Sequence, residues 1–364
     1  MKKLFKLLFK LIIAIIASAG VFIGFLTLTE FSPEEVESVE IIVTEPEGKK
    51  DYVKLDESTS VVTWNIGYAG LGAESDFFLD GGEDVKSADE KTVKRYLVGI
   101  TNAIKEQDAD FYLLQEVDRS SSRSYKIPQE NYLTEGNHSF AINYSCPFVP
   151  YPIPPIGKVE AGVMTTTEKD LNKAVRISLP NPFSWPVRIA NLKRCMLVTY
   201  TPVEGSKSQF VLINFHLEAY DGGEGKIAQT KKLIEFVEEE YKKGNYVVAG
   251  GDWNQTFPES LDVYPNTHED LWSVGYIDTD SIPKGWQLAY DLTNPTCRLL
   301  NQPYDPEDKE GTQHYVIDGF LCSPNVKVES VNTINAGFEN SDHNPVRIKF
   351  KLNSYKDNQK NENN

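Results

Sequence analysis

The 364-residue sequence has no CxxC pair, no internal repeat and no Walker-type phosphate loop. A structural zinc site usually takes paired cysteines, so none is expected. The other two absences argue against solenoid proteins and against P-loop nucleotide hydrolases. Four cysteines are present, Cys146, Cys195, Cys297 and Cys322. We expect four buried thiols, although one or two disulfides outside the cytoplasm stay open because sequence alone cannot pair them.

Positive charge is also scarce. The chain has 37 lysines and arginines against 53 acidic residues, which gives a net charge of −16. This balance argues against a broad nucleic-acid-binding surface, because such surfaces depend on cationic side chains that release counterions. A local basic groove is still compatible with it. Hydrophobic residues make up 40% of the chain, enough for one large core and a single main domain.

A long apolar run lies near the N-terminus. Residues 11–28 carry no charge and are about long enough to cross a bilayer as a helix. Lysines precede this run and acidic residues follow it: Lys2, Lys3, Lys6 and Lys10, then Glu30, Glu34, Glu35, Glu37 and Glu40. The asymmetry predicts a single-pass anchor over residues 1–29 in the cell membrane, with the rest extracytoplasmic. The alternative is secretion after cleavage near Ala17-Ser18-Ala19.

The remaining sequence divides into three parts. Residues 30–56 are acidic and contain prolines, which predicts a stalk. Residues 57–353 hold the periodic segments of one folded domain, and residues 354–364 form a polar tail that we expect to be disordered. Strands are predicted over residues 61–66, 109–117, 159–166, 194–201, 209–215, 246–249, 315–321 and 346–351. Helices are predicted over residues 88–107 and 227–241. This pattern favours two packed sheets with helices outside.

Polar residues stand at the ends of six predicted strands. They are Trp64-Asn65, Gln115-Glu116, Asn214-Phe215-His216, Asp252-Trp253-Asn254, Ile317-Asp318-Gly319 and Ser341-Asp342-His343. Each one alone is more often a turn cap or a structural residue. Packing alone does not require carboxylate, amide and imidazole groups at successive strand ends, so together they predict an active site.

These motifs, in this order, resemble the endonuclease/exonuclease/phosphatase superfamily, which includes pancreatic-type deoxyribonuclease, abasic-site endonucleases, bacterial sphingomyelinases and inositol polyphosphate phosphatases. The resemblance spans residues 61–351. It implies an α/β (α+β) fold of the deoxyribonuclease type, a four-layer sandwich of two mostly antiparallel sheets flanked by helices.

The resemblance also implies a metal site. Glu116 would be the principal Mg²⁺ ligand, with Asn65 and Asp342 close to the ion and Mn²⁺ as an alternative metal. Mg²⁺ prefers hard oxygen ligands and keeps room for water and a substrate phosphate.

Catalytic roles follow from the same resemblance. Asp252 would orient and deprotonate the attacking water, and Asn254 would hold a phosphoryl oxygen. His343 would bind the phosphate, with Asp318 fixing its tautomer. His216 would protonate the leaving group. A further candidate, Glu160, would partner His216; an exposed glutamate at a strand start is the other interpretation.

Substrate-binding candidates lie in loops. Arg119, Arg123 and Tyr125 follow Glu116 closely, and Arg298 lies in a variable stretch. Arginine suits phosphate oxygens, although a solvated loop is the simpler alternative.

Two proline-rich apolar loops, residues 147–155 and 182–186, either cover a sheet edge or contact lipid. The expected function is a membrane-anchored, Mg²⁺-dependent phosphodiesterase whose substrate is a phosphate ester, either a lipid headgroup or nucleic acid. A nuclease, a sphingomyelinase or phospholipase C-like enzyme, a phosphomonoesterase and a catalytically silent binding protein stay open. No protein partner is inferred, and a monomer is expected.

Overall fold

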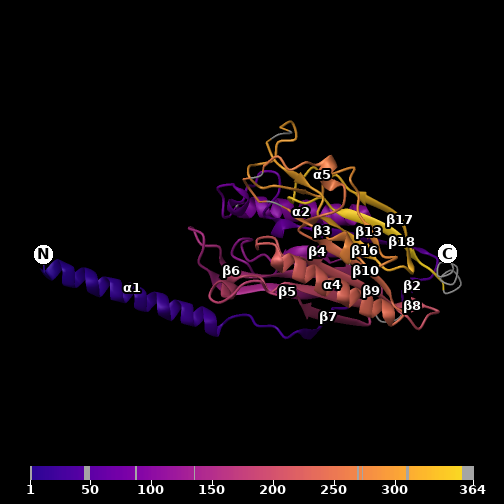
Figure 1. The fold of residues 1–364 in the computed structure, drawn as a ribbon, viewed down its shortest axis with the longest axis horizontal. Helices are drawn as coiled ribbons and strands as arrows, with labels where there is room; N and C mark the ends of the chain where they lie inside the picture. Colours follow the sequence, from indigo (N-terminus) through magenta and orange to yellow (C-terminus); the bar gives the residue numbers. More distant parts are fainter. Residues whose placement is uncertain are drawn as a thin grey trace.

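The computed structural model describes residues 2–44, 50–86, 88–134, 136–268, 270–272, 274–308 and 311–354. The tail predicted to be disordered lies outside these residues from residue 355 onward. The described part contains two large mixed sheets with helices on their outer faces (Figure 1).

The first sheet has eight strands in the order β1-β7-β8-β9-β10-β16-β13, with β2 beside β8. Their bounds are β1 (Val36–Val39), β2 (Val53–Lys54), β7 (Lys173–Ser178), β8 (Cys195–Glu204), β9 (Gln209–His216), β10 (Tyr246–Asp252), β13 (Gln287–Ala289) and β16 (Asp318–Cys322). Neighbours are antiparallel except for the pairs β9–β10 and β2–β8, which are parallel.

The second sheet has six strands in the order β17-β18-β3-β4-β6-β5. Their bounds are β3 (Ser58–Asn65), β4 (Phe111–Asp118), β5 (Asn137–Val149), β6 (Gly157–Thr167), β17 (Val326–Thr333) and β18 (Val346–Leu352). The β3–β4 pair is parallel and the other neighbours are antiparallel. Parallel central strands bring their carboxyl ends to one edge, which matters for the site below.

Three apolar clusters separate four layers. The sheets face each other through aromatic rings such as Phe210. Its ring centroid lies 5.6 Å from that of Phe111 and 5.5 Å from that of Phe350. Helix α2 (Glu90–Gln107) covers the outer face of the six-stranded sheet, and α4 (Glu224–Lys242) covers the outer face of the eight-stranded sheet. The predicted four-layer sandwich is confirmed.

Short elements complete the described chain. They are α3 (Glu130–Leu133), α5 (Ser260–Val263), η1 (Gly67–Ala69), η2 (Phe78–Asp80), η3 (Val187–Ala190), η4 (Thr279–Ser281), β11 (Gln255–Thr256), β12 (Gly275–Tyr276), β14 (Cys297–Arg298) and β15 (His314–Tyr315). All four cysteines are free and buried, as expected.

The segment predicted as a stalk, residues 30–56, contains two strands that pair with the folded domain. Strand β1 pairs antiparallel with β7, from Val36 opposite Ile177 to Val39 opposite Ala174. Strand β2 pairs with β8. The acidic composition hid this pairing, because an edge strand needs only ladder hydrogen bonds and alternate apolar residues, not an apolar run.

Helix α1 (Lys2–Leu28) extends away from the sandwich on the side where β5 and β6 lie (Figure 1). By length and composition it is apolar enough to cross a membrane. Its last turns contact the folded domain, with Leu26 buried in a cluster that includes Tyr144 and Val149.

Candidate active site

Strand register in the eight-stranded sheet places His216, Asp252 and Asp318 side by side. Asp252 at the end of β10 lies opposite His216 of β9 and opposite Asp318 of β16. Asn65, at the end of β3 in the other sheet, reaches Asp252, since its Nδ2 donates to Asp252 Oδ2 at 3.0 Å. The two sheets therefore contribute to one site where their strands end.

Two residues at the site have left-handed backbone. The β4–β6 register shifts between Leu114 and Val117, and Glu116 inside this bulge has φ 53°. Asn254, just after β10, has φ 49°. A bulge re-aims a side chain, and each such conformation costs about 1–3 kcal/mol, so the surrounding structure must hold it. Such strain is typical of functional positions.

Asn65 joins the two carboxylates. Its Oδ1 accepts a hydrogen bond from the Gly67 N–H at 3.0 Å, and its Nδ2 donates to Glu116 Oε1 at 3.2 Å as well as to Asp252. Glu116 and Asp252 therefore share one amide. Because the Asn65 oxygen is engaged by the backbone, Asn65 orients the carboxylates here.

His343 is held by a carboxylate on each side. Its Nδ1 lies 2.8 Å from Asp318 Oδ2, and its Nε2 lies 3.8 Å from Asp252 Oδ2. Asp318 accepts from Nδ1, which leaves Nε2 facing the cavity. Burial alone would lower the pKa of His343, but the neighbouring acidic groups, Asp318 foremost, outweigh it and hold the pKa well above its ordinary value. These acidic groups therefore favour the protonated, cationic form of His343.

His216 has the opposite electrostatic environment. Its Nε2 lies 3.4 Å from Asp252 Oδ2 and its Nδ1 lies 3.9 Å from Glu116 Oε1. Burial, followed by the charges of Arg194 and His343, lowers its pKa well below the ordinary value. Two imidazoles with pKa values pushed apart are suited to different tasks. The buried Nδ1 of His216 has no hydrogen-bond partner, which leaves it available to a ligand.

Asp252 and Asn254 are buried side chains of the site. Asp252 Oδ1 accepts a hydrogen bond from the Asn254 N–H at 2.9 Å, and Asn254 Nδ2 donates to the Leu217 carbonyl at 2.8 Å. Burial and the neighbouring Asp318 raise the pKa of Asp252 to about 6. The carboxylate is thus ionised above that pH and can accept a proton.

The side chains Glu116, Asp252, Asp342 and His343 line one cavity, and we call them its floor. The three carboxylates of the floor suit a divalent cation. Burial raises the pKa of Asp342 to about 7; His343 opposes the shift and Glu116 adds to it. Carboxylates crowded together in a buried cavity are what a hard metal ion would neutralise. Among the described residues, one group that could hold an ion is Asp252, Asp318 and His343.

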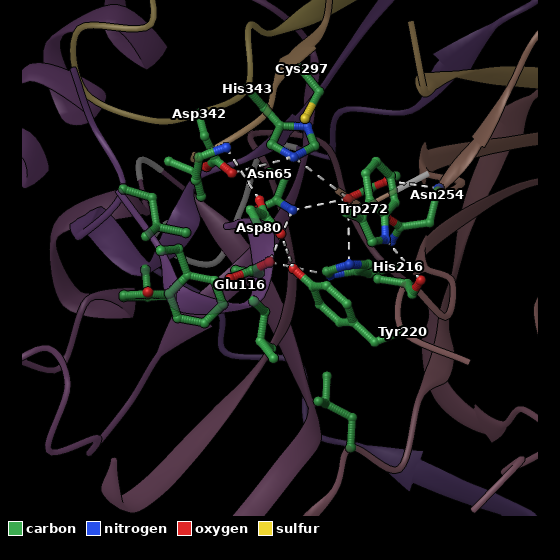
Figure 2. A pocket seen from close by; sticks show the side chains of 18 of the residues that line it. Asn65, Asp80, Glu116, His216, Tyr220, Asn254, Trp272, Cys297, Asp342 and His343 are labelled. Carbon is green, nitrogen blue, oxygen red and sulfur yellow. Dashed lines mark hydrogen bonds and ion pairs between the residues drawn. The ribbon is translucent and has the colours of Figure 1, made fainter. Parts of the chain in front are cut away.

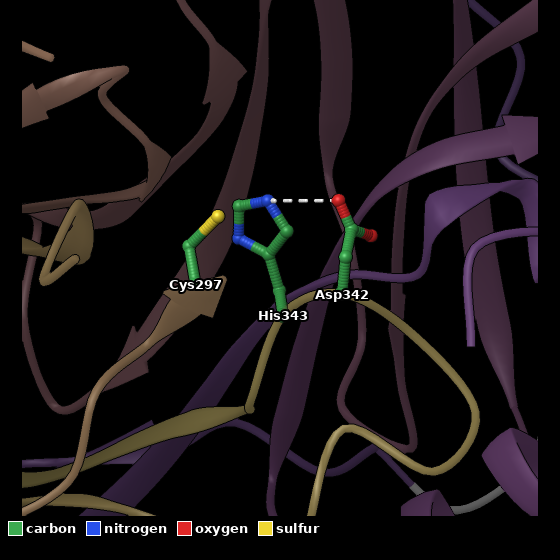
Figure 3. A group of neighbouring side chains, drawn as sticks. All are labelled: Cys297, Asp342 and His343. Carbon is green, nitrogen blue, oxygen red and sulfur yellow. Dashed lines mark ion pairs between the residues drawn. The ribbon is translucent and has the colours of Figure 1, made fainter. Parts of the chain in front are cut away.

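A second such group is Cys297, Asp342 and His343 (Figure 3). His343 Nε2 lies 3.9 Å from Asp342 Oδ2. Burial raises the pKa of the Cys297 thiol to about 12.

These residues line a cavity of about 320 Å³ (Figure 2). The sequence analysis missed part of its wall. Tyr220 donates through its hydroxyl to Asp80 Oδ1 at 2.8 Å, and Trp272 Nε1 donates to the Ala219 carbonyl at 3.0 Å. Asp80 ends the short η2, and Tyr220 and Trp272 lie outside helices and strands, so no sequence periodicity places them together.

Three predicted site residues lie elsewhere. Glu160 forms an ion pair with Lys158 at 2.9 Å, while its neighbour Ala161 lines the cavity, so the predicted partnership with His216 does not form. Arg119 pairs with Glu130 at 2.6 Å. Tyr125 donates to the Ala88 carbonyl at 3.1 Å. None of the three lines the cavity.

Two predicted arginines line the cavity but are engaged by protein groups. Arg123 pairs with Asp118 at 3.0 Å and lies over the Tyr68 ring at 3.8 Å. Arg298 is buried and donates to four backbone carbonyls, including those of Gly72 and Ser75. Their geometry is that of clamps that hold the loops of the cavity wall.

No protein-family model and no curated protein matches the chain. Solved structures do match. The endonuclease/exonuclease/phosphatase from Beutenbergia cavernae DSM 12333 matches with a TM-score of 0.50 and 18% identity, over 82% of this chain and 72% of that one. A functionally unknown conserved protein from Enterococcus faecalis V583 matches with a TM-score of 0.51 and 14% identity, over 81% of this chain and all of that one (100%). At these identities the likeness concerns the fold. The chain therefore has the deoxyribonuclease-like fold of the endonuclease/exonuclease/phosphatase superfamily, as its motif order predicted.

Proposed function

We propose that this protein is a divalent-metal-dependent phosphodiesterase, anchored in a membrane by α1, with water as the nucleophile. The observation that carries the proposal is the convergence of Glu116, Asp252 and His343, from distant parts of the sequence, on one cavity. The fold of endonuclease/exonuclease/phosphatase structures supports a hydrolase acting on phosphate esters. The catalytically silent alternative is disfavoured because each expected catalytic position carries a side chain that can bind a metal ion, accept or donate a proton, or bind phosphate.

The floor supplies a proton acceptor and a cation. Ionised Asp252 accepts the proton of the attacking water, with Oδ1 fixed by the Asn254 N–H. Cationic His343 donates through Nε2 to a phosphoryl oxygen and stabilises the charge that develops there. These roles need no movement of either side chain, because both already face the cavity.

His216 is proposed to protonate the leaving oxygen. A general acid must hold a proton, yet burial, followed by the charges of Arg194 and His343, lowers the pKa of this imidazole well below its ordinary value. The negative charge of a bound phosphate favours the protonated imidazole and so opposes this shift. A diester needs this assistance most, since its leaving group departs as an alkoxide.

Glu116 and Asp342 would hold the metal ion, Mg²⁺ or Mn²⁺, with Asn65 orienting Glu116. When bound, the ion neutralises phosphate charge and stabilises the leaving oxygen. Removal by EDTA should abolish turnover and Mg²⁺ should restore it.

The anchor follows from charge and length. Lysines at the start of α1 and acidic residues after it favour an N-terminus inside and a catalytic domain outside the cell membrane. Secretion after cleavage is the alternative, and sizing the N-terminus of the cell-expressed protein separates the two.

The test uses the soluble diester bis-p-nitrophenyl phosphate with the full-length protein. Asp252→Ala should lower kcat by about 10³-fold or more, because a positioned base contributes roughly 10²–10⁴-fold. Glu160→Gln is the matched control, since this carboxylate lies outside the cavity. Equal activity of the wild type and Asp252→Ala would refute the proposed site.

A further inference from the structure

The end of α1 is fixed to the folded domain. The Phe22 ring packs edge-on against Phe148 with centroids 5.9 Å apart, and Trp185 Nε1 donates to Thr27 Oγ1 at 3.2 Å. Beyond the helix, Glu30 pairs with Arg188 at 3.2 Å and with Lys193 at 3.0 Å. The domain is therefore held in one orientation relative to the helix axis.

These contacts set a depth. At ~1.5 Å per residue, Phe22 lies ~9 Å before the end of α1 at Leu28. The uncharged residues 11–28 span ~27 Å, close to the ~30 Å core of a bilayer. Sliding Phe22 out of the apolar layer would draw Lys10 and Lys6 into it, which is costly. Phe148, in contact with Phe22, then lies at the membrane surface or below it.

The neighbouring loops carry exposed apolar side chains. Ile153 is 92% exposed and Tyr151 68% exposed in the loop after β5, and Val187 and Trp185 are 57% and 55% exposed near η3. We name Phe148, Tyr151, Ile153, Trp185 and Val187 the insertion surface. Exposed apolar side chains that include aromatic rings, on loops beside a membrane span, are typical of a lipid-contacting face.

The same loops border the cavity. Ile156 and Phe183, next to the insertion surface in sequence, line it together with Leu192. On the other side, the Tyr151 ring contacts Phe78 with centroids 6.0 Å apart, and Phe78 lies between the lining residues Phe77 and Leu79. We call these apolar lining residues, Phe77, Leu79, Ile156, Phe183 and Leu192, the rim of the cavity. The rim therefore adjoins the insertion surface.

The cavity wall is poorly suited to nucleic acid. Its three arginines are engaged: Arg123 by Asp118, Arg298 by backbone carbonyls, and Arg194 by Glu218 at 3.1 Å. A nucleic-acid backbone needs a track of free cations. An apolar rim above a polar floor instead matches a phosphate that carries an acyl-chain portion.

We propose that the insertion surface enters the same bilayer leaflet that α1 leaves, and that the substrate is a phosphodiester lipid drawn from that leaflet. This inference rests on the phosphodiesterase function proposed above. In the reaction, a water oxygen bonds to phosphorus and one P–O ester bond breaks. Asp252 takes the proton of the water, and the leaving oxygen takes a proton from His216. No oxidant or further reactant is needed.

Full-length protein in vesicles of phosphatidylcholine, phosphatidylglycerol and sphingomyelin tests the inference. Release of water-soluble or diglyceride products is measured beside hydrolysis of bis-p-nitrophenyl phosphate by the same vesicles. Ile153→Asp should lower the ratio of lipid to soluble-diester rates at least tenfold. Val98→Asp on α2 is the control, because Val98 is also exposed, at 58%, and is not among the residues that line the cavity. An unchanged ratio in Ile153→Asp would overturn the inference.

Insertion itself has a second readout that is independent of turnover. Brominated phosphatidylcholine should quench part of the tryptophan fluorescence, and Trp185→Phe should remove that part. Identical quenching in the two proteins would overturn the insertion surface. Rapid hydrolysis of the soluble diester and of DNA with intact lipids would overturn the lipid substrate alone, whereas no hydrolysis of any diester would refute the proposed function.

Discussion

The floor and the rim of the cavity are built differently. The floor consists of charged side chains at strand ends, fixed by buried hydrogen bonds such as Asn65–Asp252 and His343–Asp318. The rim consists of apolar side chains on loops such as 147–156 and 182–192. Strands hold reacting groups within a fraction of an ångström, whereas loops change with little cost to the fold. We infer that the floor determines the chemistry and the rim determines which phosphate ester reaches it.

The largest effect is expected on the floor, at His343. His343→Ala removes the cation that faces the phosphate, so kcat for the soluble diester should fall about 10³-fold, as for loss of an oxyanion donor. Steady-state kinetics with matched circular dichroism spectra checks this. A fall in kcat of less than about fivefold in a folded variant would show that His343 does not stabilise the transition state.

The next effect concerns the support below the floor. Arg194 donates to Glu218 Oε2 and to the His216 carbonyl, both at 3.1 Å. Arg194→Met leaves the Glu218 carboxylate buried without its ion-pair partner, so unfolding free energy should fall by about 3–5 kcal/mol. Urea denaturation measures this. A loss below about 1 kcal/mol would mean that the pair does not hold the floor.

The same pair gives a pH dependence. Burial opposes ionisation of Glu218, but Arg194 outweighs it and lowers the pKa below the ordinary 4.5. The stabilisation is therefore present above the unfolded pKa and is lost as pH falls through the lower folded value. Acid titration of the free energy of unfolding should show this loss in the wild type, and it should be absent in the double variant Arg194→Met, Glu218→Gln.

A smaller effect is expected at Asp318, which touches His343 and not the phosphate. Asp318→Asn should lower kcat about 10–100-fold, the range for loss of a partner that orients a reacting group. It should also shift the pH profile, because the Asp318 carboxylate holds the pKa of His343 high. A fall in kcat without any shift of the profile would indicate a purely structural role.

The smallest effect is expected at the cavity wall. Tyr220→Phe removes one hydrogen bond to Asp80, worth about 1 kcal/mol. Because Tyr220 lines the cavity and has no proposed part in the proton transfers, KM should change more than kcat. The reverse pattern would show that Tyr220 takes part in the reaction itself.

The sequence predicted the floor because its chemistry is concentrated at strand ends. Periodic apolar segments located the strands. Glu116 and Asp252 stand near the ends of β4 and β10, and His343 stands just before β18 begins. The assignment of Glu160 failed by one residue, because alternation along β6 turns Ala161 to the cavity and Glu160 away from it. Strand pairing, which sequence alone does not give, decides that register.

The rest of the cavity wall could not be predicted for a different reason. Asp80 and Tyr220 are 140 positions apart, and neither lies in a periodic segment. Arg298 reads as a phosphate ligand in sequence, yet its burial among backbone carbonyls makes it a clamp. Only tertiary structure distinguishes an arginine that is free from one that is already engaged. The strands β5, β7 and β17 were missed because they mix polar and apolar residues without strict alternation.

Hydrolysis in ¹⁸O-labelled water tests the central claim most directly. If the floor delivers water to phosphorus, one labelled oxygen should appear in the phosphate product of the Mg²⁺-supplied wild-type protein, and Asp252→Ala should form almost none of that product. Label in the released alcohol, or an equal yield of labelled phosphate product from Asp252→Ala and the wild type, would contradict it.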